Sequence, residues 1–204
     1  MKSFYLLALA AALAFTGCKK DDSAPVQIVT SDFDPVFAQV LQQRGYIPDA
    51  NNITTADLAA ITELDVWGGE GDSPGPLTSL RGIEHFTSLT TLSCDYNELT
   101  ELEVSANTKL TDLWCNNNQL TKLDVSDNTK LETLWCFSNQ LESLDLSANT
   151  KLETLSCNNN PGDGESKFPI TAWFDNQSIP DALLYQSSWE YDGKTITIDF
   201  RKAE

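Results

Sequence analysis

The sequence predicts an α/β fold: a short solenoid with a curved parallel β-sheet, closed by a helical cap at its N-terminal end and a β-hairpin cap at its C-terminal end. Three observations predict it. Leucine and cysteine recur at a fixed interval in the middle of the chain, helix-capping patterns precede them, and a strong hairpin signal follows them. The expected boundaries are 32–60 for the N-terminal cap, 61–160 for the repeats and 161–204 for the C-terminal cap.

Composition and charge narrow the function classes. The chain has 204 residues, of which 41% are hydrophobic, so it is long and apolar enough to bury a core. Its formal net charge is -17. A surface this acidic repels phosphate groups, so we do not expect nucleic acid to be a partner.

Residues 1–17 are expected to be a lipoprotein signal peptide. A basic start at Lys2 is followed by an apolar run over 5–15 that is too short to span a bilayer. The run ends in Phe15-Thr16-Gly17-Cys18, which resembles a bacterial lipobox with Phe in place of the usual Leu. The resemblance implies cleavage before Cys18 and acyl chains on that residue, and several chains together anchor a protein stably.

The polar segment 18–31 is expected to be a lipidated tether. Its start, Lys19-Lys20-Asp21-Asp22, is similar to the short export signal that follows the lipidated cysteine in surface lipoproteins of Bacteroidota. An ordinary charged tether is the alternative. The resemblance implies an outer-membrane lipoprotein that is exposed at the cell surface.

Two helices are predicted in the N-terminal cap. Asp34 is placed to cap the first, with Pro35 at its first position and Gly45 at its end. Its expected apolar face consists of Val36, Phe37, Val40 and Leu41. The second begins at Thr54, which forms an approximate capping box with Asp57.

The centre of the chain contains four copies of one pattern at an interval of 21 residues. Each copy reads Leu-x-x-Leu-x-Cys-x-x-Asn, and the copies begin at Leu89, Leu110, Leu131 and Leu152. This is a leucine-rich repeat with cysteine in the place of the third leucine. An irregular copy precedes them, interrupted by a Gly/Pro-rich insert at 68–76 that must loop out.

Repeats of 21 residues with a cysteine at this position resemble those of the bacterial internalins. The resemblance covers residues 60–160, about half of the chain. It implies a leucine-rich-repeat fold. It implies no particular ligand, because repeats of this kind serve many unrelated partners.

Each repeat position has an expected role. One repeat cannot bury its apolar face alone, so neighbours stack and their strands form a parallel sheet. Four cysteines, Cys94, Cys115, Cys136 and Cys157, should form a buried column of free thiols rather than disulfides or a zinc site, because every repeat supplies the same core position. The asparagines that follow them should satisfy backbone groups in the turn that leaves each strand.

The segment after the repeats is expected to cap the open end of the solenoid. Residues 168–174 are apolar enough for a strand, and Asp192-Gly193 predicts a two-residue hairpin turn that places Trp189 opposite Ile196. A separate binding module is the alternative.

Catalysis is not expected. His85 is the single histidine and is interpreted as a surface residue without a nucleophile beside it. The sequence contains no phosphate-binding loop and no metal motif, so no cofactor and no metal are predicted.

The candidate ligand site is the concave face of the sheet. Between an inward Leu and an inward Cys, strand alternation turns Trp114 and Trp135 outward on neighbouring strands. The full set of candidate ligand-binding residues is Trp114, Trp135, Phe137, Tyr96, Trp67, Asp95, Asp112 and Glu132. The alternative is that the C-terminal segment or the 68–76 insert folds over these aromatic side chains and makes them core.

Two functions fit this face. The first is protein recognition or adhesion at the cell surface by a monomer, with aromatic anchors among acidic residues that favour a basic or polar partner. The alternative is glycan binding, in which flat tryptophan faces stack on sugar rings.

Overall fold

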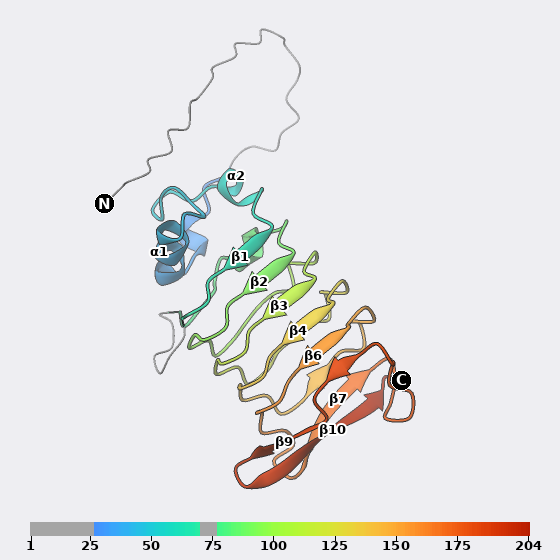
Figure 1. Ribbon diagram of the computed structural model, residues 1–204. Coiled ribbons are helices and arrows are strands. Elements are labelled where there is room, and N and C mark those ends of the chain that lie inside the picture. Colours follow the sequence, from blue (N-terminus) through green and yellow to red (C-terminus); the bar gives the residue numbers. More distant parts are fainter. Residues whose placement is uncertain (1–26, 70–76) are drawn as a thin grey trace, which may run out of the picture.

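The computed structural model describes residues 27–69 and 77–204. The predicted signal peptide, the lipidation site at Cys18 and most of the predicted tether and insert lie outside the described residues. The chain forms stacked coils whose strands lie side by side along one face, with helices at one end and a second sheet at the other (Figure 1).

One parallel sheet runs the length of the solenoid. Its order is β1-β2-β3-β4-β6-β8. The strands are β1 (Glu63–Asp65), β2 (Thr91–Ser93), β3 (Asp112–Trp114), β4 (Thr133–Trp135), β6 (Thr154–Ser156) and β8 (Leu184–Tyr185). The leucine at the centre of each repeat strand pairs in register with the next, as Leu113 does with Leu134. The predicted α/β leucine-rich-repeat solenoid is therefore confirmed, and we call the solvent-facing side of this sheet the concave face.

The core follows the repeat pattern. In β3 the middle residue, Leu113, is buried while its neighbours Asp112 and Trp114 face outward. The four repeat cysteines are buried as free thiols. Sulfur serves here as a small apolar group that fills the same core position in every coil.

Asparagine side chains join the coils. Asn118 Nδ2 donates to the carbonyl oxygens of Cys94 and Cys115, each at 3.0 Å, and its Oδ1 accepts from Leu99 N. The equivalent asparagines of the other repeats make the same pattern of bonds. The predicted structural role of this column is confirmed, because these bonds satisfy backbone groups that packing removes from water.

A second column of asparagines also joins the coils. Asn107, Asn128 and Asn149 are fully buried. Asn128 Nδ2 donates to the carbonyl oxygens of Val104 and Asn107, both at 3.0 Å. These side chains therefore join successive coils at the turns that follow Val104, Val125 and Leu146.

The first helix of the N-terminal cap has its predicted start. Helix α1 spans Pro35–Gln43, and Asp34 accepts hydrogen bonds from the backbone of Val36 and Phe37 at its start. The predicted apolar face was wrong at Val36, which is 43% exposed. Ala38 is buried instead, because the core-facing residues follow the helical period from Phe37.

The remaining cap elements are short. A 3-10 helix, η1 (Thr30–Asp32), precedes α1, and helix α2 (Thr55–Leu58) begins with the predicted Thr54–Asp57 capping box. A second 3-10 helix, η2 (Ile83–His85), belongs to the irregular repeat.

His85 lies at the surface, as expected, but it has partners there. It is half-buried, its Nε2 lies 2.9 Å from Asp32 Oδ2, and its ring stacks on Phe33 with ring centroids 5.7 Å apart. It links the helical cap to the irregular repeat.

The C-terminal cap adds strands to two sheets: β8 joins the sheet of the concave face, and the remaining strands form a second sheet with β5. Strands β9 (Ser188–Tyr191) and β10 (Lys194–Lys202) form the predicted hairpin, with Trp189 opposite Ile196. Strand β10 also pairs with β7 (Lys167–Ala172), and β7 pairs with β5 (Leu144–Asp145) of the last full repeat. Buried Trp189 donates from Nε1 to the carbonyl oxygen of Asn160 at 2.9 Å. This segment shares its core with the repeats, which disfavours the alternative of a separate module.

Within residues 27–69 and 77–204, no helix has the length and apolarity needed to cross a bilayer. Nor do three or more metal-ligating side chains gather there in a group that could hold a metal ion.

Candidate functional site

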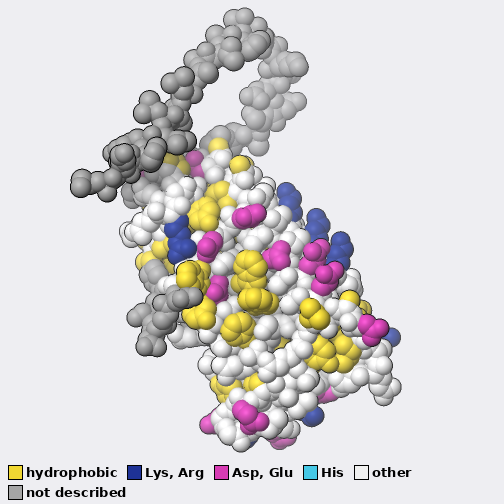
Figure 2. Space-filling view, in the orientation of Figure 1, with side chains coloured by type: hydrophobic (Ala, Val, Ile, Leu, Met, Phe, Trp, Pro, Cys, Tyr) yellow, Lys and Arg dark blue, Asp and Glu magenta, His cyan; other side chains and the backbone are white. Residues whose placement is uncertain are grey.

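An open cavity of about 450 Å³ lies on the concave face, over strands β1 to β4. Its lining residues are Asp65, Trp67, Ser93, Asp95, Tyr96, Trp114, Asn116, Trp135 and Phe137. Figure 2 shows hydrophobic side chains gathered on this face with acidic side chains among them. We call this feature the aromatic cavity.

The tryptophans at its centre come from in-register positions. Trp114 pairs with Trp135 in the sheet, and their ring centroids are 6.1 Å apart with an angle of 58° between the ring planes. The ring of Trp135 also lies 6.4 Å from that of Phe137. Trp135 is 41% exposed, so the C-terminal cap does not cover it. The part of the insert at 70–76 lies outside the described residues.

Tyr96 enters the cavity from a turn with left-handed backbone. Four residues at equivalent repeat positions have positive φ: Tyr96 (55°), Asn117 (53°), Ser138 (53°) and Asn159 (56°). Asparagine tolerates this conformation, whereas a bulky side chain makes it costly. Tyr96 therefore holds a strained backbone while its ring lies 6.4 Å from that of Trp67, edge to face.

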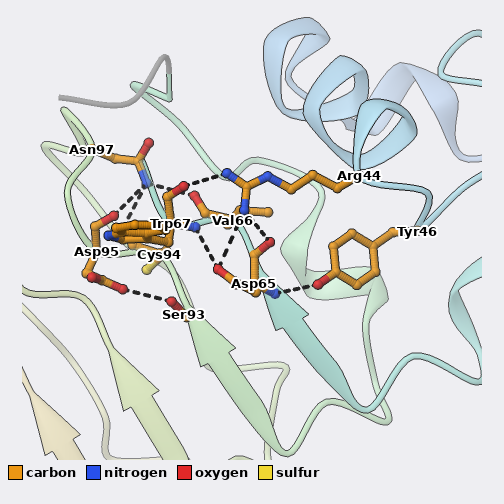
Figure 3. Close-up of polar contacts among 9 residues, drawn as sticks. All are labelled: Arg44, Tyr46, Asp65, Val66, Trp67, Ser93, Cys94, Asp95 and Asn97. Carbon is orange, nitrogen blue, oxygen red and sulfur yellow. Dashed lines mark hydrogen bonds and ion pairs between the residues drawn. The ribbon is translucent and has the colours of Figure 1, made fainter. Parts of the chain in front are cut away.

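The N-terminal cap fixes the rim of the cavity at Trp67. Arg44 donates to the carbonyl oxygen of Asp65 at 2.9 Å and also to that of Trp67. Tyr46 Oη accepts from Asp65 N at 2.8 Å, and Asp65 Oδ1 accepts from Trp67 N at 3.0 Å (Figure 3). Residues from the segment after α1 thus set the position of a residue in the irregular repeat.

Two carboxylates give the cavity its charge. Asp65 Oδ1 lies 3.6 Å from Arg44 Nη1, which supplies a counter-charge. Asp95 accepts from Ser93 Oγ at 2.7 Å. Burial raises the pKa of Asp95, the hydrogen bond from Ser93 opposes that rise, and the negative charge of Asp65 adds to it. The carboxylate of Asp95 is therefore held where water stabilises it poorly.

Two buried polar atoms near the cavity lack partners. Trp114 Nε1 and Asn116 Oδ1 make no hydrogen bond, and Asn116 is only 3% exposed. Buried polar atoms in proteins are nearly always paired. Partners are also missing at Asn117 Nδ2 and at Oδ1 of Asn107, Asn128 and Asn149, which lie outside the cavity lining, so these unpaired atoms do not by themselves mark a ligand site.

With the geometry established, comparison with known families identifies the repeats. The model described as "Leucine Rich repeats (2 copies)" matches residues 87–128. The chain contains leucine-rich repeats. No curated protein sequence is significantly similar to this leucine-rich-repeat chain as a whole.

The leucine-rich-repeat chain is structurally similar to internalins of Listeria monocytogenes. The structure of the functional domain of InlJ, which includes a cysteine ladder, is 30% identical, and the match covers 74% of this chain and 39% of that one, with a TM-score of 0.47. An InlF structure is 19% identical, with 71% and 58% covered and a TM-score of 0.53. An InlC2 structure is 16% identical, with 89% and 100% covered and a TM-score of 0.42. The matches span less than two thirds of the InlJ and InlF chains.

Most of the candidate residues meet in the leucine-rich-repeat cavity, but not all. Two do not line it. Glu132 is exposed on the surface just before β4, and Asp112 accepts a hydrogen bond from Thr111 Oγ1 at 2.8 Å. A role of Glu132 and Asp112 in ligand binding therefore stays a prediction, for the part of the concave face outside the cavity.

Three lining residues were not among the candidates: Asp65, Ser93 and Asn116. The repeat register contained the signal for two of them. Ser93 and Trp114 share one outward column, and Asn116 precedes the asparagine column by two residues, as Asp95 and Phe137 do in their repeats. Asp65 lies in the irregular copy, and its pairing with Ser93 becomes evident only from the sheet.

Proposed function

We propose that this protein is a lipid-anchored surface protein that binds a protein partner through the aromatic cavity, in recognition or adhesion. One observation carries the proposal: five aromatic side chains from successive coils gather in one open cavity, with the carboxylates of Asp65 and Asp95 among them. Aromatic residues in a pocket are typical anchors of protein interfaces, and exposed apolar clusters of this kind usually have an occupant.

The ring geometry favours a protein over a glycan. The planes of Trp114 and Trp135 meet at 58°, and those of Trp67 and Tyr96 at 89°. A sugar ring stacks on a flat face, whereas these tilted rings form walls around a hollow. Such a hollow suits a single projecting side chain of a partner.

The anchor belongs to the proposal on sequence grounds. Cys18 follows an apolar run and a lipobox-like segment, and the charged Lys19 to Asp22 segment resembles an export signal for surface display. An acylated Cys18 would hold the repeats at the outer membrane, with the tether allowing the concave face to meet a partner.

Site-specific photo-crosslinking tests the binding. Ser156 lies beside Trp135 in the sheet, so a photoreactive phenylalanine analogue at position 156 faces the cavity rim. We expect a protein-sized adduct on intact cells exposed to candidate partner surfaces, and its loss in a Trp135→Ala background. Adducts that persist in that background would contradict the proposal, and adducts whose added mass is removed by glycosidase would favour the glycan alternative.

A further inference from the structure

We propose that the aromatic cavity receives the guanidinium group of an arginine side chain of the protein partner, an inference that rests on the proposed function and specifies the chemistry of its partner. The charge of the cavity and the chemistry of its aromatic rings each support this occupant.

The charge of the cavity is balanced at one carboxylate and unbalanced at the other. Asp65 has its counter-charge in Arg44, with Nη1 and Oδ1 3.6 Å apart. Within residues 27–69 and 77–204, Asp95 has no ion-pair partner, and Ser93 is its one side-chain hydrogen-bond donor. Asp95 is also half-buried, which makes its unpaired charge unfavourable. One positive charge from outside would compensate it.

The aromatic walls favour a cation and, among cations, a guanidinium. The faces of aromatic rings carry negative potential and attract positive groups. A guanidinium is planar, stacks on aromatic faces, is weakly hydrated and keeps its in-plane N–H groups free to bind a carboxylate. A lysine ammonium is more strongly hydrated and loses more solvation in an apolar hollow. The paired rings of Trp114 and Trp135, with Asp95 among the lining residues, match the guanidinium better.

Short peptides test the inference directly. The probe is acetyl-Gly-Arg-Gly-amide, compared with the same peptide carrying citrulline, which is neutral and nearly isosteric, and with the lysine peptide. Binding to the full chain is followed by tryptophan fluorescence and calorimetry. We expect the arginine peptide to bind about tenfold more tightly than the citrulline peptide, and its affinity to fall with added salt. Equal affinity for arginine and citrulline, or tighter binding of lysine, would overturn the inference.

A matched pair of variants locates the binding. Asp95→Asn keeps an acceptor for Ser93 Oγ but removes the charge, whereas Asp127→Asn removes one charge from an exposed turn outside the cavity lining. We expect about a tenfold loss of arginine-peptide affinity in Asp95→Asn and wild-type affinity in Asp127→Asn. If both substitutions had equal effects, the net charge of the protein alone would explain the attraction, and the assignment would be overturned. Thermal melts of both variants establish that they are folded.

The peptide and crosslinking experiments can contradict the arginine assignment and the proposed function separately. Crosslinking that depends on Trp135 but is unaffected by Asp95→Asn, together with no preference for the arginine peptide, would leave the proposed function standing and overturn the arginine assignment. An arginine preference that depends on Asp95, with crosslinking indifferent to Trp135, would support a guanidinium site and overturn the proposed function.

Discussion

Arg44, just after helix α1, donates a hydrogen bond to the carbonyl oxygen of Trp67 at the rim of the aromatic cavity. The same guanidinium bonds the carbonyl of Asp65 and lies 3.6 Å from its carboxylate. The helical cap therefore does more than close the apolar end of the solenoid. It positions one wall of the site and balances one of its two charges.

Removing this guanidinium should loosen the wall. In Arg44→Ala we expect a loss of about 1–2 kcal/mol in the free energy of unfolding, because charge-assisted hydrogen bonds to two carbonyls disappear. In fluorotryptophan NMR, the Trp67 signal should shift and broaden while those of Trp114 and Trp135 stay close to their wild-type positions. Lys122→Ala, an exposed charge loss, is the control. Unchanged Trp67 signals would show that the cap does not position this ring.

The two central tryptophans should respond differently to truncation. Trp135 is 41% exposed, so Trp135→Ala should reduce partner binding more than tenfold, about 2 kcal/mol, with a change in unfolding free energy below about 0.5 kcal/mol. Trp114 is half-buried, so Trp114→Ala should weaken binding and also lower the melting temperature. A large drop in melting temperature for Trp135→Ala would instead make this residue part of the scaffold.

Tyr96 should show a trade between stability and binding. Its equivalents in the second and fourth repeats are Asn117 and Asn159, and all three adopt positive φ. We expect Tyr96→Asn to raise the free energy of unfolding by about 1 kcal/mol, because asparagine tolerates left-handed backbone, and to weaken partner binding. The reciprocal variant, Asn117→Tyr, should destabilise. Urea titrations of both variants would refute the idea if Tyr96→Asn proved less stable than wild type.

The cysteine column should make the fold sensitive to alkali. Burial raises the pKa of all four thiols, that of Cys157 to about 12, and neighbouring cysteines add to the rise at Cys94, Cys115 and Cys136. In the unfolded chain these thiols ionise at about pH 8.5, whereas at that pH in the folded chain they stay protonated. Their contribution is therefore complete below about pH 8.5 and is lost as the pH rises toward the folded pKa values.

Each thiol should cost about 1.4 kcal/mol of stability per pH unit above about pH 8.5. Urea titrations at increasing pH would measure the slope, and Cys115→Ala should reduce it by the share of one thiol. An identical slope in this variant would mean that other groups dominate. Below that pH range, thiol-reactive reagents should label the four cysteines only after unfolding.

The proposed anchor predicts acylation of Cys18. Labelled fatty acid should enter the wild-type protein and not Cys18→Ala, and protease added to intact cells should remove the repeats. Retained label in Cys18→Ala would exclude this anchor. Label without protease sensitivity would place the protein in the envelope but not at the surface.

The sequence by itself determined the solenoid, its register and the outward direction of the central aromatic residues. A strict interval of 21 residues forces equivalent positions of successive coils to stack, so Leu113 must meet Leu134, and Trp114 must meet Trp135. Alternation along a strand then decides which side chains leave the core. These constraints are local and periodic, so they can be recognised in a single sequence.

Only the tertiary structure decided how the site is completed. Arg44 and Tyr46 meet Asp65 across a gap of about twenty residues, and Ser93 pairs with Asp65 across a longer interval than the 21 residues of the regular repeats. The hairpin cap joins β5 through β7, a contact that no local pattern encodes. Each of these contacts occurs only once and does not follow the repeat period. They depend on how the N-terminal and C-terminal caps pack against the repeats. That is the physical reason why the sequence predicted the walls of the cavity but not its charge balance.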